Sequence, residues 1–130
     1  MTMKQTFHLQ ALPEQFAICK LTSESHIPGW ATLGEIWSIT RSTTELSILC
    51  PQSHVPQEVP AERNWRALKV FGSLPFEMVG VLSSLTGTLA EAGISLFAVS
   101  TFDTDIILVR TQTFEAACLA LTNSGHIIIF

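Results

Sequence analysis

Residues 74–110 carry the pattern that most constrains this fold, an amphipathic helix followed by two strands that an acidic turn joins. Apolar side chains recur at three- and four-residue steps through residues 79–92, which predicts a helix with one buried face. Gly93 can end that helix, because glycine adopts a positive φ without strain. The apolar content and length of residues 94–100 and 106–110 predict two strands.

The flanking residues complete a known order of elements. Residues 66–71 predict a strand before the helix, and Thr113 can cap a second helix that ends at residues 123–125. Residues 127–130 predict a last strand. Residues 66–130 therefore read as β-α-β-β-α-β, the ferredoxin-like α+β order, with two helices on one face of an antiparallel sheet.

The first half of the chain predicts a reduced version of the same arrangement. Residues 16–21 form an apolar run of strand length, and residues 37–41 and 45–49 predict a hairpin. Between them there is room only for a short helix around residues 30–33. We expect a first module with strands and little helix.

An acidic-turn signature occurs twice and indicates two related modules. Residues 44–49 (TELSIL) match residues 104–109 (TDIILV), so that Glu45 is the counterpart of Asp105. The proline-rich residues 51–64 read as a connecting loop, because proline cannot donate to a strand ladder. We therefore predict an N-terminal module at 1–60 and a C-terminal module at 61–130, packed together.

Composition narrows the class of protein. Of the 130 residues 47% are apolar and 14% charged, so a packed core is expected and disorder is not. The formal charge of −4 and the scattered Lys and Arg residues argue against nucleic-acid binding. The low charge favours a surface buried in a partner, and a homodimer is the simplest expectation.

The chain shows no secretory signal and no apolar run long enough to span a membrane, so we expect a cytoplasmic protein. Cys19, Cys50 and Cys118 are far apart and lie in apolar stretches. They read as reduced, packed thiols rather than disulfide partners or nucleophiles.

The sequence lacks the motifs expected of an enzyme or of a nucleic-acid-binding protein. The four histidines are dispersed, and none stands at a metal-ligand spacing from a cysteine or another histidine. Neither a nucleophile elbow nor a phosphate-binding loop is present. RNA-binding modules of this fold carry aromatic residues beside Lys and Arg on their strands, whereas residues 106–109 are aliphatic and follow acids. We expect no enzyme activity, no cofactor and no metal.

Particular residues give the chain a family resemblance. Residues 80–82, 89–90, 92–95 and 100–101 (GVL, LA, AGIS, ST) resemble an ACT domain, the amino-acid-binding regulatory module. The block at 100–109, preceded by TRSTTELSI, is similar to small bacterial tandem-ACT proteins and, through them, to the paired ACT modules of cytosolic arginine sensors. The resemblance covers nearly the whole chain from Phe16 onward.

The resemblance implies a free amino acid bound between the loop before the first long helix and the start of the following strand. A helix N-terminus can hold the ligand carboxylate through free backbone amides. We place the ligand at the seam of the two modules, where the loop and the acidic turn contact it. The predicted ligand-binding residues are Gly72, Ser73, Leu74, Phe76, Glu77, Gly80, Ile94, Ser100, Thr101, Asp103 and Glu45.

The acids among these residues favour a basic or neutral ligand. Each acid also has a structural interpretation: Glu77 can complement the helix dipole, Asp103 can form the turn, and Glu45 with Asp105 can reflect a shared hairpin. Two functions stay open. One is an amino-acid sensor that acts on a regulated partner protein; the other is a structural dimerisation module without a ligand.

Overall fold

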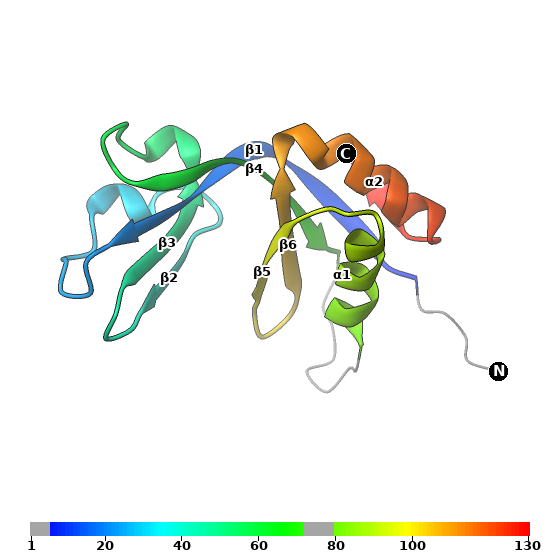
Figure 1. Ribbon diagram of the computed structural model, residues 1–130, viewed down its shortest axis with the longest axis horizontal. Helices are drawn as coiled ribbons and strands as arrows, with labels where there is room; N and C mark the ends of the chain where they lie inside the picture. Colours follow the sequence, from blue (N-terminus) through cyan, green and yellow to red (C-terminus); the bar gives the residue numbers. More distant parts are fainter. Residues whose placement is uncertain (1–5, 72–79) are drawn as a thin grey trace. The chain divides into compact units, whose positions relative to one another are not determined.

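The computed structural model describes residues 6–71 and 80–130, which form two compact units. One, here called the helical unit, contains the described residues of Met1–Pro13 and Arg66–Phe130. The other, the strand unit, is Glu14–Trp65. Strands β1 (His8–Leu21) and β4 (Ala61–Val70) each run through both units (Figure 1).

The helical unit has the predicted ferredoxin-like α+β fold. Its strands follow the order β7-β1-β4-β6-β5, and its two helices lie on one face of the sheet (Figure 1). The elements that follow β4 are α1 (Val81–Glu91), β5 (Leu96–Ser100), β6 (Asp105–Arg110), the 3₁₀ helix η3 (Thr111–Thr113), α2 (Phe114–Asn123) and β7 (Ile127–Ile129).

The N-terminal half of β1 belongs to this sheet, which the sequence analysis did not foresee. It lies between β7 and β4, and β7 pairs with it in parallel from His8↔Ile127 to Gln10↔Ile129. The backbone N–H of Phe71 donates to His8 O at 2.7 Å. The prediction that the first strand starts at Phe16 is therefore wrong. Its true start depends on a partner strand more than a hundred positions away, which local periodicity does not reveal.

The core of the helical unit follows the predicted helical periodicity. Val81, Leu85 and Leu89 are buried at four-residue steps on α1 and pack in one cluster with α2 and the sheet. Gly93 has φ 73° and ends the helix as predicted. The predicted helix start at residues 75–79 lies outside the described residues.

The second helix starts where predicted, although its cap works differently. Thr113 is the cap residue of α2, but its side chain makes no capping hydrogen bond. Instead Thr113 Oγ1 donates to Arg110 O at 3.1 Å, because η3 brings that carbonyl within reach.

The strand unit contains the predicted hairpin. β2 (Ser38–Arg41) pairs with β3 (Leu46–Pro51), and the sheet order is β2-β3-β1-β4. The expected short helix is the 3₁₀ helix η1 (Gly29–Thr32), and a second 3₁₀ helix, η2, covers Gln52–His54. The connecting loop predicted at residues 51–64 extends too far, because β4 already begins at Ala61. No helix among the described residues is long and apolar enough to cross a membrane.

Candidate functional site

The start of α1 follows a glycine that provides no side-chain cap. Gly80 precedes the helix at φ 84° and ψ 6°, a left-handed conformation that glycine adopts most easily. Its carbonyl accepts the first helical hydrogen bond from Ser84 N at 2.9 Å. Glycine has no side chain that could cap the first-turn N–H groups, and N–H groups at a helix start can donate to an anion such as a carboxylate.

The turn between β5 and β6 is held by its threonines. Thr101 N donates to Thr104 O at 2.8 Å, and Thr104 N donates to Thr101 Oγ1 at 3.1 Å. Thr104 Oγ1 in turn donates to Val70 O at 2.8 Å, in a buried position. Thr104 therefore fixes the turn beside the end of β4, while Phe102 and Asp103 stay exposed at its tip. The sequence analysis did not single out Thr104.

Several predicted site residues meet at one end of the helical unit. Figure 1 shows the first turn of α1 and the β5–β6 turn, which carries Thr101 and Asp103, at the same end of that unit. Ser100 is the last residue of β5 before this turn. Ile94 instead follows the other end of α1, whose 11 residues span about 16 Å. Within one helical unit a single amino acid cannot contact both Gly80 and Ile94.

The remaining predicted loop residues lie outside the described residues. They are Gly72, Ser73, Leu74, Phe76 and Glu77.

Glu45 lies in the strand unit, in a turn that resembles the one at Thr101–Thr104. Ser42 N donates to Glu45 O at 2.9 Å, and Ser42 Oγ accepts from the N–H groups of Thr44 and Glu45. Arg41 donates from its guanidinium group to the carbonyls of Ser23 and Ser25. Glu45 therefore sits in a four-residue hairpin turn.

Strand register corrects the match between the two acidic turns. Arg41 pairs with Leu46 across the first turn, and Ser100 pairs with Asp105 across the second. Glu45 thus corresponds to Thr104 rather than to Asp105. The predicted equivalence of Glu45 and Asp105 is therefore wrong by one residue. Because side chains alternate along a strand, an alignment shifted by one residue compares side chains that point to opposite faces of the sheet.

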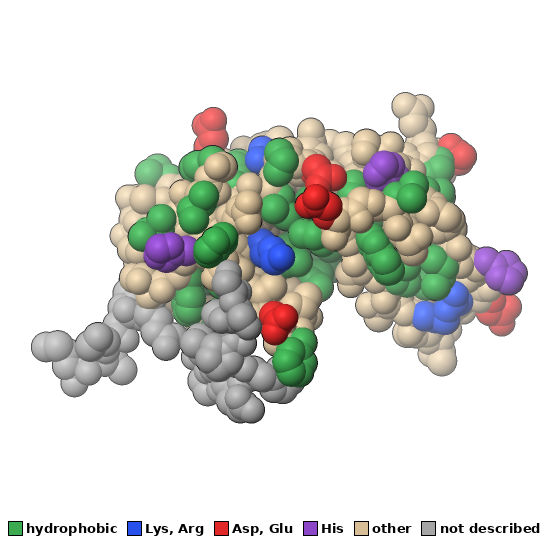
Figure 2. Space-filling view, turned by 180° about the vertical axis from the view of Figure 1, so that it is seen from behind, with side chains coloured by type: hydrophobic (Ala, Val, Ile, Leu, Met, Phe, Trp, Pro, Cys, Tyr) green, Lys and Arg blue, Asp and Glu red, His purple; other side chains and the backbone are tan. Residues whose placement is uncertain are grey.

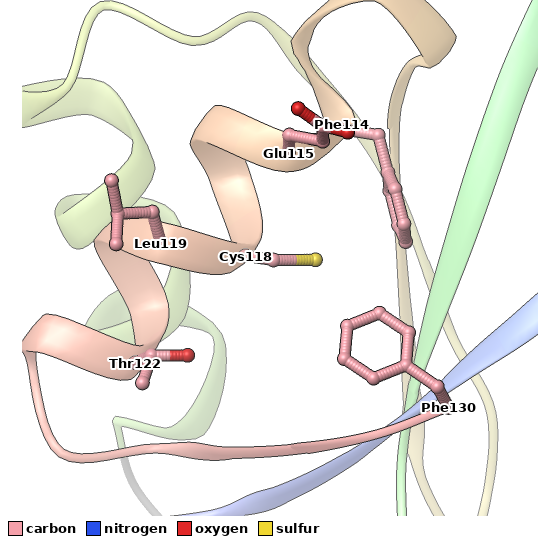
Figure 3. A pocket seen from close by; sticks show the side chains of 6 residues that line it. All are labelled: Phe114, Glu115, Cys118, Leu119, Thr122 and Phe130. Carbon is pink, nitrogen blue, oxygen red and sulfur yellow. The ribbon is translucent and has the colours of Figure 1, made fainter.

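A cavity of about 300 Å³ lies in the helical unit along α2. Figure 3 shows side chains of α2 on one side and the ring of Phe130 on the other. The Arg66 guanidinium lies 4.2 Å from the centre of the Phe114 ring and donates to Leu12 O. Burial raises the pKa of the Cys118 thiol. The lining residues are Phe114, Glu115, Cys118, Leu119, Thr122 and Phe130.

None of the predicted ligand residues lines this cavity. Phe114 and Cys118 are one helical turn apart, which sequence periodicity could detect, but Phe130 reaches them only through the tertiary fold. The walls are mainly apolar with the single acid Glu115, so the cavity suits an apolar group. Across residues 6–71 and 80–130, no group of three or more His, Cys, Asp or Glu side chains is placed to hold a metal ion.

The fold and these features agree with a family comparison. Residues 61–123 match the ACT domain family, and residues 14–58 match a second family model, which describes an N-terminal domain. The crystal structure of protein Atu0741 from Agrobacterium tumefaciens is 36% identical with a TM-score of 0.92, covering 97% of this chain and 94% of that protein. The chain belongs to the same family as this Agrobacterium protein, and its C-terminal half is an ACT domain.

More distant structures share the fold alone. A Vibrio cholerae protein of unknown function, VC0802, described as a possible transport protein, has a TM-score of 0.71 at 18% identity, over 92% of this chain and 91% of its own. The regulatory subunit of aspartate kinase from Thermus flavus has a TM-score of 0.63 at 11% identity, over 93% and 99%. No curated protein matches the chain.

Proposed function

We propose that this protein is a non-catalytic regulatory protein that binds a free amino acid in its helical unit. The observation that carries the proposal is the match of residues 61–123 to the ACT domain family, in which α1 follows a left-handed glycine that has no capping side chain. The first-turn amides of α1 are suited to the ligand carboxylate, because backbone N–H groups and the helix dipole both favour a negative charge there. The regulatory subunits of aspartate kinase share this fold, which supports a regulatory role.

The polar groups at the same end of the unit define the rest of the site. Ser100 is exposed and carries a hydroxyl group, Asp103 carries a carboxylate at the tip of the turn, and the Thr101 hydroxyl holds that turn through Thr104. We assign the ligand ammonium or a basic side chain to Asp103; Glu77, the other predicted acid, lies outside the described residues. A basic or neutral amino acid is therefore favoured over aspartate or glutamate.

A thermal-shift screen against the twenty amino acids tests this proposal. A ligand present at about 100 times its Kd stabilises the fold by about 2.7 kcal/mol, which is readily measured. We expect one or two basic or neutral amino acids to raise Tm, and Asp103→Ala to weaken that response. Glu58→Ala, at an exposed acid in the strand unit, is the matched control and should leave the response unchanged. A flat response to all twenty would reject the sensor.

A dimerisation module without a ligand is the second candidate function. Leu119 is 63% exposed and Phe130 is 82% exposed, and Ile127 on β7 is half exposed. Apolar surface of this kind often marks a protein interface. We propose a homodimer in either case, and sedimentation as a dilute monomer would contradict it.

We also propose a cytoplasmic protein that acts on a partner protein and not on nucleic acid or a membrane. The face in Figure 2 shows exposed hydrophobic side chains among scattered charged ones. The Lys and Arg side chains on that face form no continuous basic stripe of the kind that binds a phosphate backbone.

A further inference from the structure

Two of the three cysteines are neighbours in the strand unit, although thirty residues separate them in the sequence. Strand pairing sets Ala17 opposite Cys50 and Cys19 opposite Ile48. Cys19 and Cys50 are thus diagonal neighbours on one face of the β1–β3 ladder. They are 1% and 0% exposed and share one apolar cluster. The cysteines are free and buried, as the sequence predicts, but their separation in the sequence does not reveal that Cys19 and Cys50 are neighbours.

The two thiols are chemically unequal. A hydrogen bond from Cys50 lowers the pKa of Cys19, against the effect of burial, and the charge of Arg63 lowers it further. The same hydrogen bond and burial raise the pKa of Cys50. Arg63 is fixed by hydrogen bonds from its guanidinium group to Pro56 O and Val59 O. Within the pair, the hydrogen bond from Cys50 therefore makes Cys19 the more acidic thiol, and the thiolate is the form of cysteine that acts as a nucleophile.

We propose that Cys19 and Cys50 form a redox-active dithiol that hydrogen peroxide converts into a disulfide between β1 and β3. The Cys19 thiolate attacks one peroxide oxygen and breaks the O–O bond, which leaves Cys19 as a sulfenic acid and releases hydroxide. Cys50 then gives up its proton and attacks the Cys19 sulfur, so that the S–S bond forms as the S–O bond breaks. The two thiols lose two electrons and two protons, and one peroxide becomes two waters.

The position of the pair makes this disulfide easy to reduce. Diagonal neighbours on antiparallel strands have Cα atoms about 7–8 Å apart, beyond the usual disulfide range. Closing the bond therefore shifts the two strands, and disulfides formed under strain are the labile and regulatory ones. Peroxide is close to water in size and reaches the buried sulfurs during local opening of the strand unit.

Oxidation of the native full-length chain, followed by peptide mapping, tests the proposal. Reduced protein is treated with hydrogen peroxide, quenched in acid, alkylated while denatured and digested without reductant. We expect an intact mass lower by two hydrogens and a linked peptide that joins Cys19 to Cys50, which dithiothreitol removes. The linked peptide should be lost in Cys19→Ser and Cys50→Ser and retained in the matched control Cys118→Ser.

Two results would overturn the proposal. One is native wild-type protein in which no linked Cys19–Cys50 peptide forms while Cys118 is oxidised. The other is a linked peptide that appears only when peroxide is added in urea, which would show that the folded pair does not react. Both results come from the wild-type chain, so they stand even if a serine variant folds poorly.

Discussion

Two buried polar side chains, Thr104 and His126, join elements of the helical unit that are distant in sequence. Thr104 Oγ1 donates to Val70 O, which connects the β5–β6 turn to β4. His126 Nδ1 accepts from Phe7 N at 3.0 Å, and its ring stacks on Phe7 with centroids 5.6 Å apart. Each bond lies in a buried place, where losing it costs the desolvation of the group left behind.

Replacing Thr104 by valine should destabilise the protein although the side chain keeps its shape. Val70 O would lose its hydroxyl donor inside the protein, at a cost of about 1–3 kcal/mol. Urea unfolding measures this loss as a lower midpoint. Thr43→Val, at an exposed turn position, is the control and should change little. Equal midpoints for Thr104→Val and wild type would show that the hydroxyl is not required.

Stability should fall in mild acid because of His126. Its Nδ1 accepts a hydrogen bond only when the ring is neutral, whereas a histidine in the unfolded chain gains a proton near pH 6.5. The unfolded state thus binds more protons, and stability is lost as the pH falls below about 6.5. Thermal melts between pH 8 and pH 5 measure the loss. His126→Asn offers a non-titrating acceptor and should melt with a weaker dependence on pH. An unchanged dependence would reject this role.

At the scale of elements, α1 shows how local sequence and packing combine. The helix buries one side chain per turn, and left-handed glycines stand at both of its ends. Gly87 lies inside the helix, is exposed, and would meet nothing within 4 Å if it carried a Cβ. Gly87 therefore occupies a position where a side chain would fit, whereas Gly93 occupies one whose positive φ favours glycine.

Alanine at these two glycines should change stability in opposite directions. Gly87→Ala should stabilise by about 0.5–1 kcal/mol, because glycine in a helix loses more backbone entropy than alanine does. Gly93→Ala should destabilise by about 1–2 kcal/mol, because φ 73° is strained for a residue with a Cβ. Chemical denaturation of both variants measures the change in their free energy of unfolding. Two changes of the same sign would contradict the different roles given to Gly87 and Gly93.

At the scale of the whole molecule, two continuous strands make the units depend on each other. β1 and β4 each contribute residues to both units, so we expect the two units to unfold together. Circular dichroism and tryptophan fluorescence report on different units. Both described α-helices belong to the helical unit, and the three tryptophans, Trp30, Trp37 and Trp65, belong to the strand unit.

Unfolding should therefore be a single transition seen by both probes. Helical circular dichroism and tryptophan fluorescence should give the same urea midpoint. Leu85→Ala, which opens a cavity in the core of the helical unit, should lower both midpoints together, at a cost of about 2–5 kcal/mol. A fluorescence midpoint that stays at the wild-type value would mean that the strand unit unfolds independently.

Local periodicity predicted most elements of the C-terminal half and the hairpin of the first half. It failed where pairing over long distances decides the outcome. The early start of β1 depends on β7, and the register of the two turns depends on which residues face each other across each hairpin. Of the predicted ligand-binding residues, Gly80 and Asp103 lie at one end of the helical unit and Ile94 at the other, and their role in binding stays a prediction.

The sequence by itself determined the order of helices and strands, because each depends on neighbours a few positions away: apolar steps on α1, glycine after it, and short apolar runs for strands. Only the tertiary structure decided which strands share a sheet, that Phe130 completes a cavity with α2, and that Cys19 and Cys50 meet. These features depend on contacts between residues far apart in the chain. Their free energy is gained only once the whole core has formed.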